Sequence, residues 1–443
     1  MRPNTSSIVL KFGGSSLSCA EQFQKAADII HADSARRYVV VSAPGKRDDN
    51  DVKITDMLYT CYDQAVSGQD FSGVLGRIRR RFADIARDLG LDIDIYGEME
   101  TIRRHLSGSP SREYMASRGE YLSARLMSAY LGFRFIDATR CIIFNADGTL
   151  DRDGTYAAIS RVMRGVDHAV VPGFYGAQAD GTVRTFSRGG SDVTGAILAR
   201  GINADLYENW TDVSGMMTAD PRIVDNPRPI DYISYTELRE LAYMGASVLH
   251  EDAVFPARHA GIPINIRNTN RPDDPGTVIT RDIPDGALRP VTGIAGCRGF
   301  SSILIEKAMM NAEIGFGRRV LQVLEDYGLS FEHLPSGIDT MSVLLDTASL
   351  GTCREQLLED IRRAVSPDTL CVEDGLAIIA VVGRGMVCTK GTAARIISAV
   401  ANADVNIRML DQGSSELNII LGVSESDYET TIRAIYNEFD TFS

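Results

Sequence analysis

Short apolar runs alternate with helical stretches over the first 290 residues, and this alternation constrains the fold more than any other feature. Strands that alternate with helices build a largely parallel sheet covered by helices on both faces. The expected strands are residues 7–11, 38–41, 141–144, 168–171, 204–207 and 262–266. Ligands of such sheets bind beyond the carboxyl ends of the strands. Residues 1–289 are therefore predicted to form one α/β domain.

The chain changes character between residues 268 and 290, where four prolines stand close to glycines and aspartates. Such a cluster is typical of a linker or an exit loop. An internal repeat with an ungapped offset of 76 residues follows. The matched pairs are Arg319 and Arg395, Leu321 and Ile397, Leu324 and Val400, Leu329 and Val405, Phe331 and Ile407, Leu334 and Leu410, Gly337 and Gly413, and Val343 and Ile419.

Each copy of the repeat has the pattern of an amphipathic helix, a strand, a turn rich in glycine and serine, and another strand. Two copies are too few for a solenoid. They predict two small α+β modules, at residues 290–370 and 371–443, between which strands can be exchanged. Interfaces between paired modules form clefts, where small ligands often bind.

Composition excludes several classes of protein. The 443 residues are 44% hydrophobic and 24% charged, as in an ordinary globular protein with about three domains. The formal net charge of −13 argues against nucleic acid or an anionic membrane as partner. We find no signal sequence and no apolar stretch of the ~20 residues that a membrane helix needs. Seven scattered cysteines without a C-x-x-C favour reduced thiols in the cytoplasm over disulfides or a zinc site.

Two glycine-rich turns are candidate anion sites. The first, KFGGSSL, begins with Lys11 at the end of an expected strand, and its glycines let backbone N–H groups approach a phosphate. The alternative is a plain turn with a surface lysine. The second, SRGGSD, offers Arg188 for a carboxylate or phosphate, while Asp192 has the alternative role of a helix cap. Together the turns suggest a phosphate donor and an anionic acceptor.

Two further segments carry chemistry. Residues 116–126 form a helical pattern that is apolar on two sides, so Glu120 is expected to be a buried charge. A ligand ammonium would pair with it, and the alternative is a salt bridge to Arg118, Arg125 or a distant arginine. Residues 209–222 place Thr211, Asp212, Asp220 and Arg222 around a proline-containing turn, although the only tryptophan, Trp210, is more often a core residue.

The ordered set of these motifs resembles the aspartokinase family, a branch of the amino-acid kinase superfamily, in its monofunctional form. The resemblance covers nearly the whole chain and implies the family's largely parallel, helix-covered sheet followed by two ACT modules that sense amino acids. The motifs are KFGGSSL, SAPGKR with Thr55-Asp56, SRGE, RGGSD, WTDVSG, TADPR, GASVLH, IPINIRNT and QGSSELNI.

The resemblance implies that MgATP phosphorylates the side-chain carboxylate of L-aspartate. The products are 4-phospho-L-aspartate and ADP, in the first step towards lysine, threonine and methionine. The residues implied to be catalytic are Lys11, Arg188 and Asp192. The residues implied to bind nucleotide are Lys11, Phe12, Gly13, Gly14, Ser15, Thr211, Asp212, Asp220 and Arg222. The residues implied to bind aspartate are Thr55, Glu120 (on the ammonium), Arg188 (on a carboxylate), Gly189 and Ser191.

The implied chemistry needs few protein groups. An aspartate side chain, with a pKa of about 3.9, is already ionised at neutral pH, so no general base is required. Alignment and charge neutralisation are required instead, and Lys11 is assigned to the transferring phosphoryl group. We expect Mg²⁺ to be held mainly by the nucleotide, with no metal ligand from the chain.

The sequence departs from the family at three positions. Many relatives have glycine where Ser187 stands, tyrosine where Met217 stands and lysine where Ser247 stands. The last two changes remove an aromatic contact to adenine and a phosphate contact, so the nucleotide pocket is expected to be atypical.

A segment of the first repeat resembles the effector site of lysine-sensitive relatives. Glu332 would hold an effector ammonium, and the effector would be lysine, threonine or both. The alternative is a set of solvated turn residues. Helices of ACT pairs face another subunit, so we expect a homodimer or a dimer of dimers. The implied regulatory residues are Ser330, Phe331, Glu332, Ser336 and Asp339.

Three other functions compete with this interpretation. The first is a kinase of another amino acid, such as glutamate, although SRGE, RGGSD and the repeat favour aspartate. The second is a catalytically silent amino-acid sensor, which Met217 and Ser247 permit but Lys11, Glu120 and Arg188 disfavour. The third, a scaffold protein, has no positive support in the sequence.

Overall fold

The computed structural model describes residues 6–440 except 188, 247, 248, 250 and 285. The chain divides into two compact units. The first contains residues 1–216, 229–235 and 248–283, and the second contains residues 217–228, 236–247 and 284–443. Within the described residues, every helix is too short or too polar to span a lipid bilayer.

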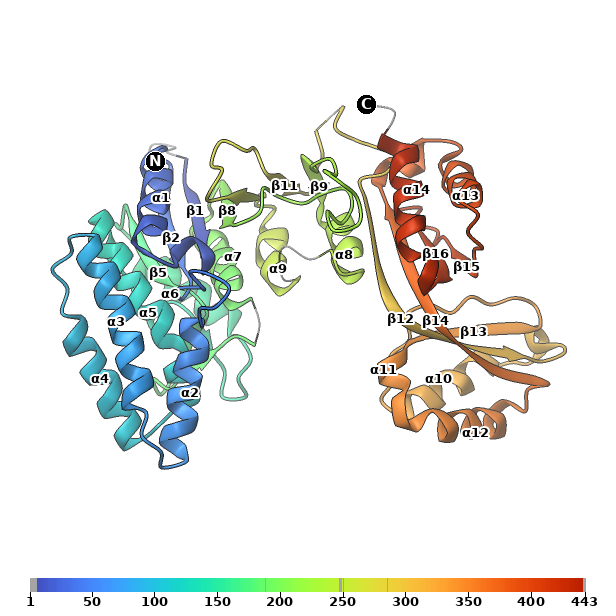
Figure 1. The fold of residues 1–443 in the computed structure, drawn as a ribbon, viewed down its shortest axis with the longest axis horizontal. Helices are drawn as coiled ribbons and strands as arrows, with labels where there is room; N and C mark the ends of the chain where they lie inside the picture. The colour runs from blue at the N-terminus through green and yellow to red at the C-terminus, as the bar shows by residue number, and fades with distance from the viewer. Residues whose placement is uncertain (1–5, 188, 247–248, 250, 285, 441–443) are drawn as a thin grey trace. The chain divides into compact units, whose positions relative to one another are not determined.

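An eight-stranded sheet forms the centre of the first unit (Figure 1). Six neighbouring strands are parallel, and the last two run antiparallel to them. This sheet confirms the predicted α/β class. In spatial order the strands are β3 (Arg134–Phe135), β5 (Ala169–Pro172), β2 (Arg36–Val41), β1 (Ile8–Phe12), β8 (Leu206–Thr211), β10 (Ile264–Asn268), β11 (Thr277–Thr280) and β9 (Tyr232–Ser234).

Helices cover both faces of this sheet. One layer packs its apolar side chains against Leu10 and Phe12 of β1. It consists of α1 (Ala20–His31), α2 (Ile54–Val66), α3 (Ser72–Asp88), α4 (Ile95–Gly108) and α5 (Arg112–Leu131). Side chains alternate along a strand, so Val9 and Lys11 point to the opposite face. That face is covered by α6 (Arg152–Val162), α7 (Gly190–Ile202) and α9 (Glu251–Ala260).

Two segments of the first unit differ from expectation. The expected strand at 141–144 is reduced to β4 (Ile143–Phe144), in a separate sheet with β6 (Tyr175–Gln178) and β7 (Val183–Thr185). The expected linker at 268–290 contains β11, because Ile264–Ile266 of β10 offer an antiparallel edge on which it pairs. The 3₁₀ helices of this unit are η1 (Ser15–Leu17) and η2 (Ala138–Arg140).

A five-stranded antiparallel sheet forms the second unit, in the order β13 (Thr340–Asp346), β12 (Gly293–Glu306), β14 (Thr369–Val382), β16 (Asn418–Ser424) and β15 (Met409–Asp411). The predicted repeat is confirmed, since β12 and β14 begin and end 76 residues apart. The same offset separates α10 (Phe316–Asp326) from α13 (Thr392–Asn402). The remaining helices are α8 (Tyr235–Tyr243), α11 (Thr347–Leu350), α12 (Arg354–Val365), α14 (Tyr428–Asp440), η3 (Met310–Ala312), η4 (Gly351–Cys353), η5 (Arg384–Cys388) and η6 (Glu425–Asp427).

The long strands β12 and β14 run side by side and serve two cores (Figure 1). Ile303 and Ile305 of β12 pack with α10, α12 and β13. Ile294, near the start of the same strand, instead packs with α13, α14 and β16. The module boundary at 370/371 therefore falls within β14, and the limits of the predicted modules stay a prediction.

Gly119 of α5 provides a test of helix packing in the first unit. A Cβ added there would lie 2.6 Å from the Cβ of Ala43, so Gly119→Ala must push α5 away from the β2–α2 loop. We expect a loss of about 1–3 kcal/mol in the free energy of unfolding. Urea unfolding followed by fluorescence of the only tryptophan, Trp210, measures it in this unit.

The matched control is Gly76→Ala in α3, where an added Cβ has no neighbour within 4 Å. This variant should be more stable than the parent by ~0.5–1 kcal/mol, because glycine is a poor helix residue. Equal stability changes for the two variants would contradict the inferred close packing at Gly119.

Candidate active site

The order of the sheet reverses at β1. The chain continues from β1 into β2 on one side, and β8 later joins β1 on the other. Ligands of open α/β sheets bind in the crevice at such a point, beyond the carboxyl ends of the strands. Lys11 and the first glycine-rich turn stand at this end of β1, and Thr211 and Asp212 stand at the same end of β8.

Lys11 forms a buried ion pair across the α7 face of the sheet. Its Nζ lies 2.5 Å from Oδ1 of Asp192, in the first turn of α7. Asn209, which is level with Lys11 on β8, donates from Nδ2 to the same oxygen at 2.8 Å. Lys11 is 7% exposed, so the alternative of a surface lysine is wrong. The pair connects the two glycine-rich turns, since Lys11 belongs to the first and Asp192 to the second.

Close backbone contacts shape the first turn. Gly13 N–H donates to the carbonyl of Trp210 at 2.9 Å, and Gly45 N–H donates to the carbonyl of Gly14 at 2.7 Å. A Cβ on Gly14 would lie 2.8 Å from the carbonyl oxygen of Ala43, so no side chain fits between the two loops. Phe12 is fully buried and stacks on Trp210 at a centroid distance of 6.1 Å, and its carbonyl accepts from Ser42 N–H, so its side chain and its carbonyl both have partners within the protein.

The second turn leads into the N-terminus of α7. Gly189 has φ +56°, a left-handed conformation that favours glycine. Ser191 is buried, and a Cβ on Gly173 would lie 2.6 Å from its Oγ. The unpaired N–H groups of a helix N-terminus attract anions, so this end of α7 suits a carboxylate or a phosphate. Arg188 lies outside the described residues.

Glu120 is a buried carboxyl group in α5. Burial raises its pKa to about 8, against hydrogen bonds from the backbone of Ala43 and of Glu120 itself, which favour the charged form. Its Oε2 is buried and accepts no hydrogen bond from the described residues. Within that part of the chain no basic side chain forms an ion pair with Glu120. An incoming cation would therefore find an unused acceptor.

Two of the three predicted alternatives for Glu120, the salt bridges to Arg118 and to Arg125, are not formed, because both arginines have other partners. Arg118 stacks on the rings of Tyr114, Tyr121 and Tyr175, and its guanidinium donates to Ser117 Oγ. Arg125 instead pairs with Glu98 at 3.3 Å. Neither arginine forms an ion pair with Glu120.

The other predicted contacts are distributed over both units. Thr55 is half-buried in the first turn of α2, and Ser15 begins η1. Thr211 and Asp212 end β8, where Asn268 Nδ2 donates to the carbonyl of Asp212 at 3.2 Å.

Asp220 and Arg222 belong to the second unit and pair with each other at 2.6 Å. A hydrogen bond from Arg222 lowers the pKa of Asp220. Their segment packs on the second unit through Ala219 and Val224. The structure therefore does not bring Asp220 and Arg222 together with Thr211 in one unit.

The predicted regulatory residues lie in the segment between α10 and β13. Glu332 N–H donates to the carbonyl of Leu344 at 2.8 Å, and its carboxylate accepts from the hydroxyl of Tyr243 in α8. Asp339 accepts from Met309 N–H at 2.8 Å. The remaining three are exposed: Ser330, Phe331 and Ser336.

Two contributors to the site were missed from the sequence. Asn209 is a buried amide in β8, beside the buried Glu208. Thr269 follows β10, and its Oγ1 lies 2.7 Å from Ser16 Oγ beside the first turn. Among the described residues, no group of three or more His, Cys, Asp or Glu side chains is arranged to hold a metal ion.

Comparisons with known proteins agree with this architecture. The model of the amino acid kinase family matches residues 6–268, and the model of the ACT domain matches residues 379–439. The fold and the site thus define a member of the amino acid kinase family. Within it the chain belongs to the aspartokinases, since it is 40% identical to aspartokinase 3 of Bacillus subtilis, over 97% of this chain and 98% of that protein.

Two solved structures extend the comparison. The crystal structure of aspartate kinase from Clostridium acetobutylicum matches with a TM-score of 0.90 and 48% identity, over 98% of this chain and 100% of that chain. Aspartokinase III of Escherichia coli, in complex with lysine and aspartate, matches with a TM-score of 0.73 and 25% identity, over 99% and 100%. The resemblance inferred from the sequence motifs is confirmed at the level of family and fold.

The burial of Glu120 predicts how the free energy of unfolding depends on pH. Below its ordinary pKa of 4.5 the group is neutral in both folded and unfolded chains. Between pH 4.5 and 8 the unfolded chain ionises first, so the folded state loses about 1.4 kcal/mol per pH unit. Glu120→Gln should remove this loss, and its advantage over the parent should grow by a few kcal/mol from pH 5 to pH 8.

Urea unfolding at both pH values, followed by Trp210 fluorescence, measures the effect. The control is Glu21→Gln, an exposed side chain on α1 that should leave the pH dependence unchanged. An advantage of Glu120→Gln that is equal at pH 5 and pH 8 would show that Glu120 is not held in an unfavourable environment.

Proposed function

We propose that this protein transfers the γ-phosphoryl group of ATP to the side-chain carboxylate of L-aspartate, giving 4-phospho-L-aspartate and ADP. The observation that carries the proposal is the buried Glu120, whose Oε2 has no partner among the described residues. An amino-acid ammonium is a cation of the right charge and size to pair with it. Membership of the aspartokinases favours aspartate over glutamate as the acceptor.

The residues of the chain hold and neutralise the reactants. Glu120 binds the ammonium, and Arg188 with the N-terminus of α7 binds a carboxylate. An oxygen of the ionised side-chain carboxylate attacks the γ-phosphorus, and the bond from that phosphorus to the β,γ-bridging oxygen breaks. ADP leaves with the bond's electrons, and no proton has to be removed from the nucleophile. Lys11 neutralises charge on the transferring group. Asp192 pairs with the Lys11 ammonium, and Asn209 holds Asp192 by donating to the same carboxylate oxygen.

The nucleotide is proposed to enter along the first glycine-rich turn, over Gly13, Gly14 and Ser15. Mg²⁺ bound to the phosphates would supply charge neutralisation there. The ion is proposed to be held mainly by the nucleotide, because Mg²⁺ commonly keeps several water ligands and binds substrate phosphates. The remaining residues proposed for the nucleotide site are Phe12, Thr211, Asp212, Asp220 and Arg222.

We also propose feedback inhibition by lysine, threonine or both, through the segment that contains Glu332. The lysine complex of Escherichia coli aspartokinase III supports lysine as one candidate. We further propose that the protein forms a homodimer or a dimer of dimers and is located in the cytoplasm. Its reaction would be the first step of the pathway to lysine and threonine.

Lys11→Ala separates catalysis from binding. Loss of the ammonium should lower kcat for aspartate-dependent ADP release at least ~100-fold, about 2.7 kcal/mol in the barrier, because the charge acts mainly in the transition state. The KM for aspartate should change less than about threefold. The control is Lys25→Ala, on the outer part of α1, which should retain activity. A rise in KM with kcat unchanged would overturn the role of Lys11.

The same assay of the parent protein tests the proposed function itself. ADP release from MgATP that requires L-aspartate, and not L-glutamate, is the expected result. Folded protein without aspartate-dependent turnover would overturn the proposal and favour a silent sensor. Amino-acid binding measured by calorimetry would then identify what is sensed.

Glu332→Gln tests the regulatory segment. If Glu332 binds the effector ammonium, removing its charge should raise the lysine or threonine concentration for half-inhibition at least ~10-fold, with uninhibited kcat unchanged. Glu325→Gln, a change to an exposed carboxylate on α10, should leave inhibition as it is. Unaltered inhibition in Glu332→Gln would place the effector elsewhere.

A further inference from the structure

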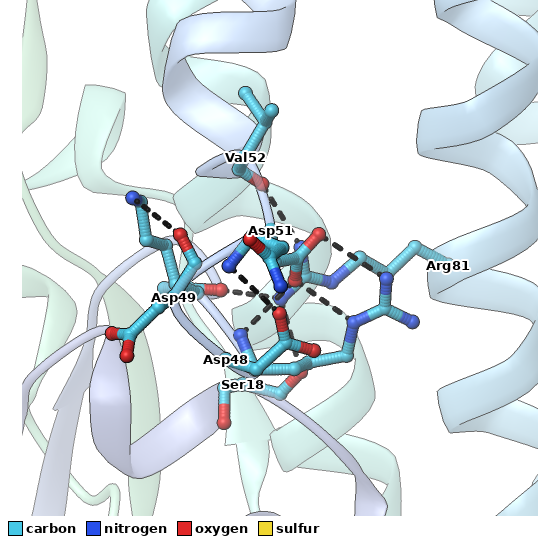
Figure 2. Close-up of polar contacts among 10 residues, drawn as sticks. Ser18, Asp48, Asp49, Asp51, Val52 and Arg81 are labelled. Atoms are coloured by element: carbon cyan, nitrogen blue, oxygen red, sulfur yellow. Dashed lines mark hydrogen bonds and ion pairs between the residues drawn. The ribbon is translucent and has the colours of Figure 1, made fainter.

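Arg81 of α3 reaches into the loop that joins β2 to α2. Only 5% of this residue is exposed. Three of the four groups that accept from its guanidinium are neutral backbone carbonyls. Figure 2 shows the guanidinium extending from the helix towards Asp51 and Val52 of the loop and towards Ser18. The side chain thus connects three segments of the first unit that are distant in sequence.

Each terminal nitrogen of Arg81 serves two acceptors. Nη1 donates to the carbonyl of Val52 at 3.1 Å and lies 2.9 Å from Oδ2 of Asp51. Nη2 donates to the carbonyl of Ser18 at 3.2 Å and to the carbonyl of Gly45. A planar guanidinium presents its donors in a fixed fork, so the positions of these four acceptors are set relative to one another.

Two of these acceptors belong to the wall of the first glycine-rich turn. Ser18 directly follows η1, which continues that turn. Gly45 touches the turn itself, since its N–H donates to Gly14 and an added Cβ would lie 2.7 Å from the carbonyl carbon of Gly14. Both backbone polar groups of Gly45 are therefore occupied, one by the turn and one by Arg81. Arg81 therefore holds the turn indirectly, through its hydrogen bonds to the carbonyls of Gly45 and Ser18.

Asp51 closes the loop on the other side of Arg81. Its carboxylate accepts from the backbone N–H of Arg47 at 3.0 Å and from Nε of Arg47 at 2.8 Å. The hydrogen bond from Arg47 holds the pKa of Asp51 well below its usual range, with Arg81 adding to the effect. The loop is therefore closed by an ionised carboxylate between two guanidinium groups.

We propose that Arg81 is a positioning residue that holds the first glycine-rich turn in the shape that receives the nucleotide phosphates. The inference rests on the proposed kinase function, because that function places phosphate at the turn. Arg81 acts through Gly45 and Ser18, and the backbone N–H groups of Gly14 and Ser15 are what it orients, since Gly13 N–H already donates to Trp210. Backbone donors that are already in place need no rearrangement when phosphate binds.

Aspartate binding should depend less on Arg81 than nucleotide binding does. Ala43, whose backbone contacts Glu120, stands close to the end of β2. Ser42 N–H donates to the carbonyl of Phe12 at 3.1 Å and continues the β1–β2 ladder up to that point. Ala43 is thus held by the sheet, whereas Gly45 is held by Arg81 and Gly14.

The test uses Arg81→Met, which keeps an apolar side chain of similar length, and Arg81→Lys, which keeps the charge without the fork. The control is Arg80→Met, an exposed neighbour on the same helix. Calorimetry measures MgADP and L-aspartate binding to each full-length protein. Arg81→Met should weaken MgADP binding at least tenfold and aspartate binding less than threefold, with Arg81→Lys in between. Arg80→Met should bind both as the parent does.

Hydrogen exchange followed by mass spectrometry adds a readout that needs no ligand. Amides in residues 13–18 and 43–52 should exchange at least tenfold faster in both Arg81 variants, while amides of β12 and β14 keep the parent rate. If Arg81→Met does not fold, Arg81→Lys carries both measurements.

Two results would overturn the positioning role: MgADP binding within twofold of the parent in a folded Arg81 variant, or equal losses for both ligands. If the parent protein neither binds MgADP nor releases ADP from MgATP in the presence of aspartate, the proposed kinase function itself would be overturned. Hydrogen exchange at residues 13–18 that is unchanged in the Arg81 variants would overturn the positioning role of Arg81 by itself, whatever the binding results.

Discussion

The buried ion pair between Lys11 and Asp192 is the contact on which the site depends. It ties the central strand β1 to the first turn of α7, and Asn209 of β8 bonds the same carboxylate oxygen. Lys11 is buried and the Asp192 side chain is only 17% exposed, so losing one would leave the other without its opposite charge in a poorly solvated place and destabilise the fold. The pair therefore fixes the N-terminus of α7 over the carboxyl end of β1. Two turns separated by more than 170 residues come together as a result.

The site around this pair consists mainly of backbone in close contact. Gly14 meets Gly45, Gly173 meets Ser191 and Gly119 meets Ala43, each at a distance that excludes a side chain. Such contacts bring backbone segments closer together than side chains would allow. Glu120, next to Gly119 in α5, forms no ion pair with a basic side chain among the described residues, and burial raises its pKa. Under the proposed function, the ammonium of an amino-acid ligand would relieve this unfavourable burial.

Much of the fold followed from local pattern. The strands β1, β2 and β5 are apolar because both faces of the sheet are covered, and apolar runs predict such strands well. The repeat was visible because helix and strand positions keep one offset. By contrast, β11 lies in a proline-rich segment, where only the free edge of β10 makes a strand favourable. The role of Arg81 could not be inferred from local pattern, since its partners at Ser18, Gly45 and Asp51 are distant in sequence.

The sequence by itself determined the family, the α/β and α+β classes, and the identity of the two glycine-rich turns, because these depend on residue type and spacing along the chain. Only the tertiary structure decided that Lys11 is buried against Asp192, that Glu120 lacks a cation among the described residues, and that Asp220 with Arg222 belongs to the second unit. The physical reason is that burial and pairing depend on neighbours supplied by other elements. A charged side chain's environment is therefore fixed only when the chain has folded.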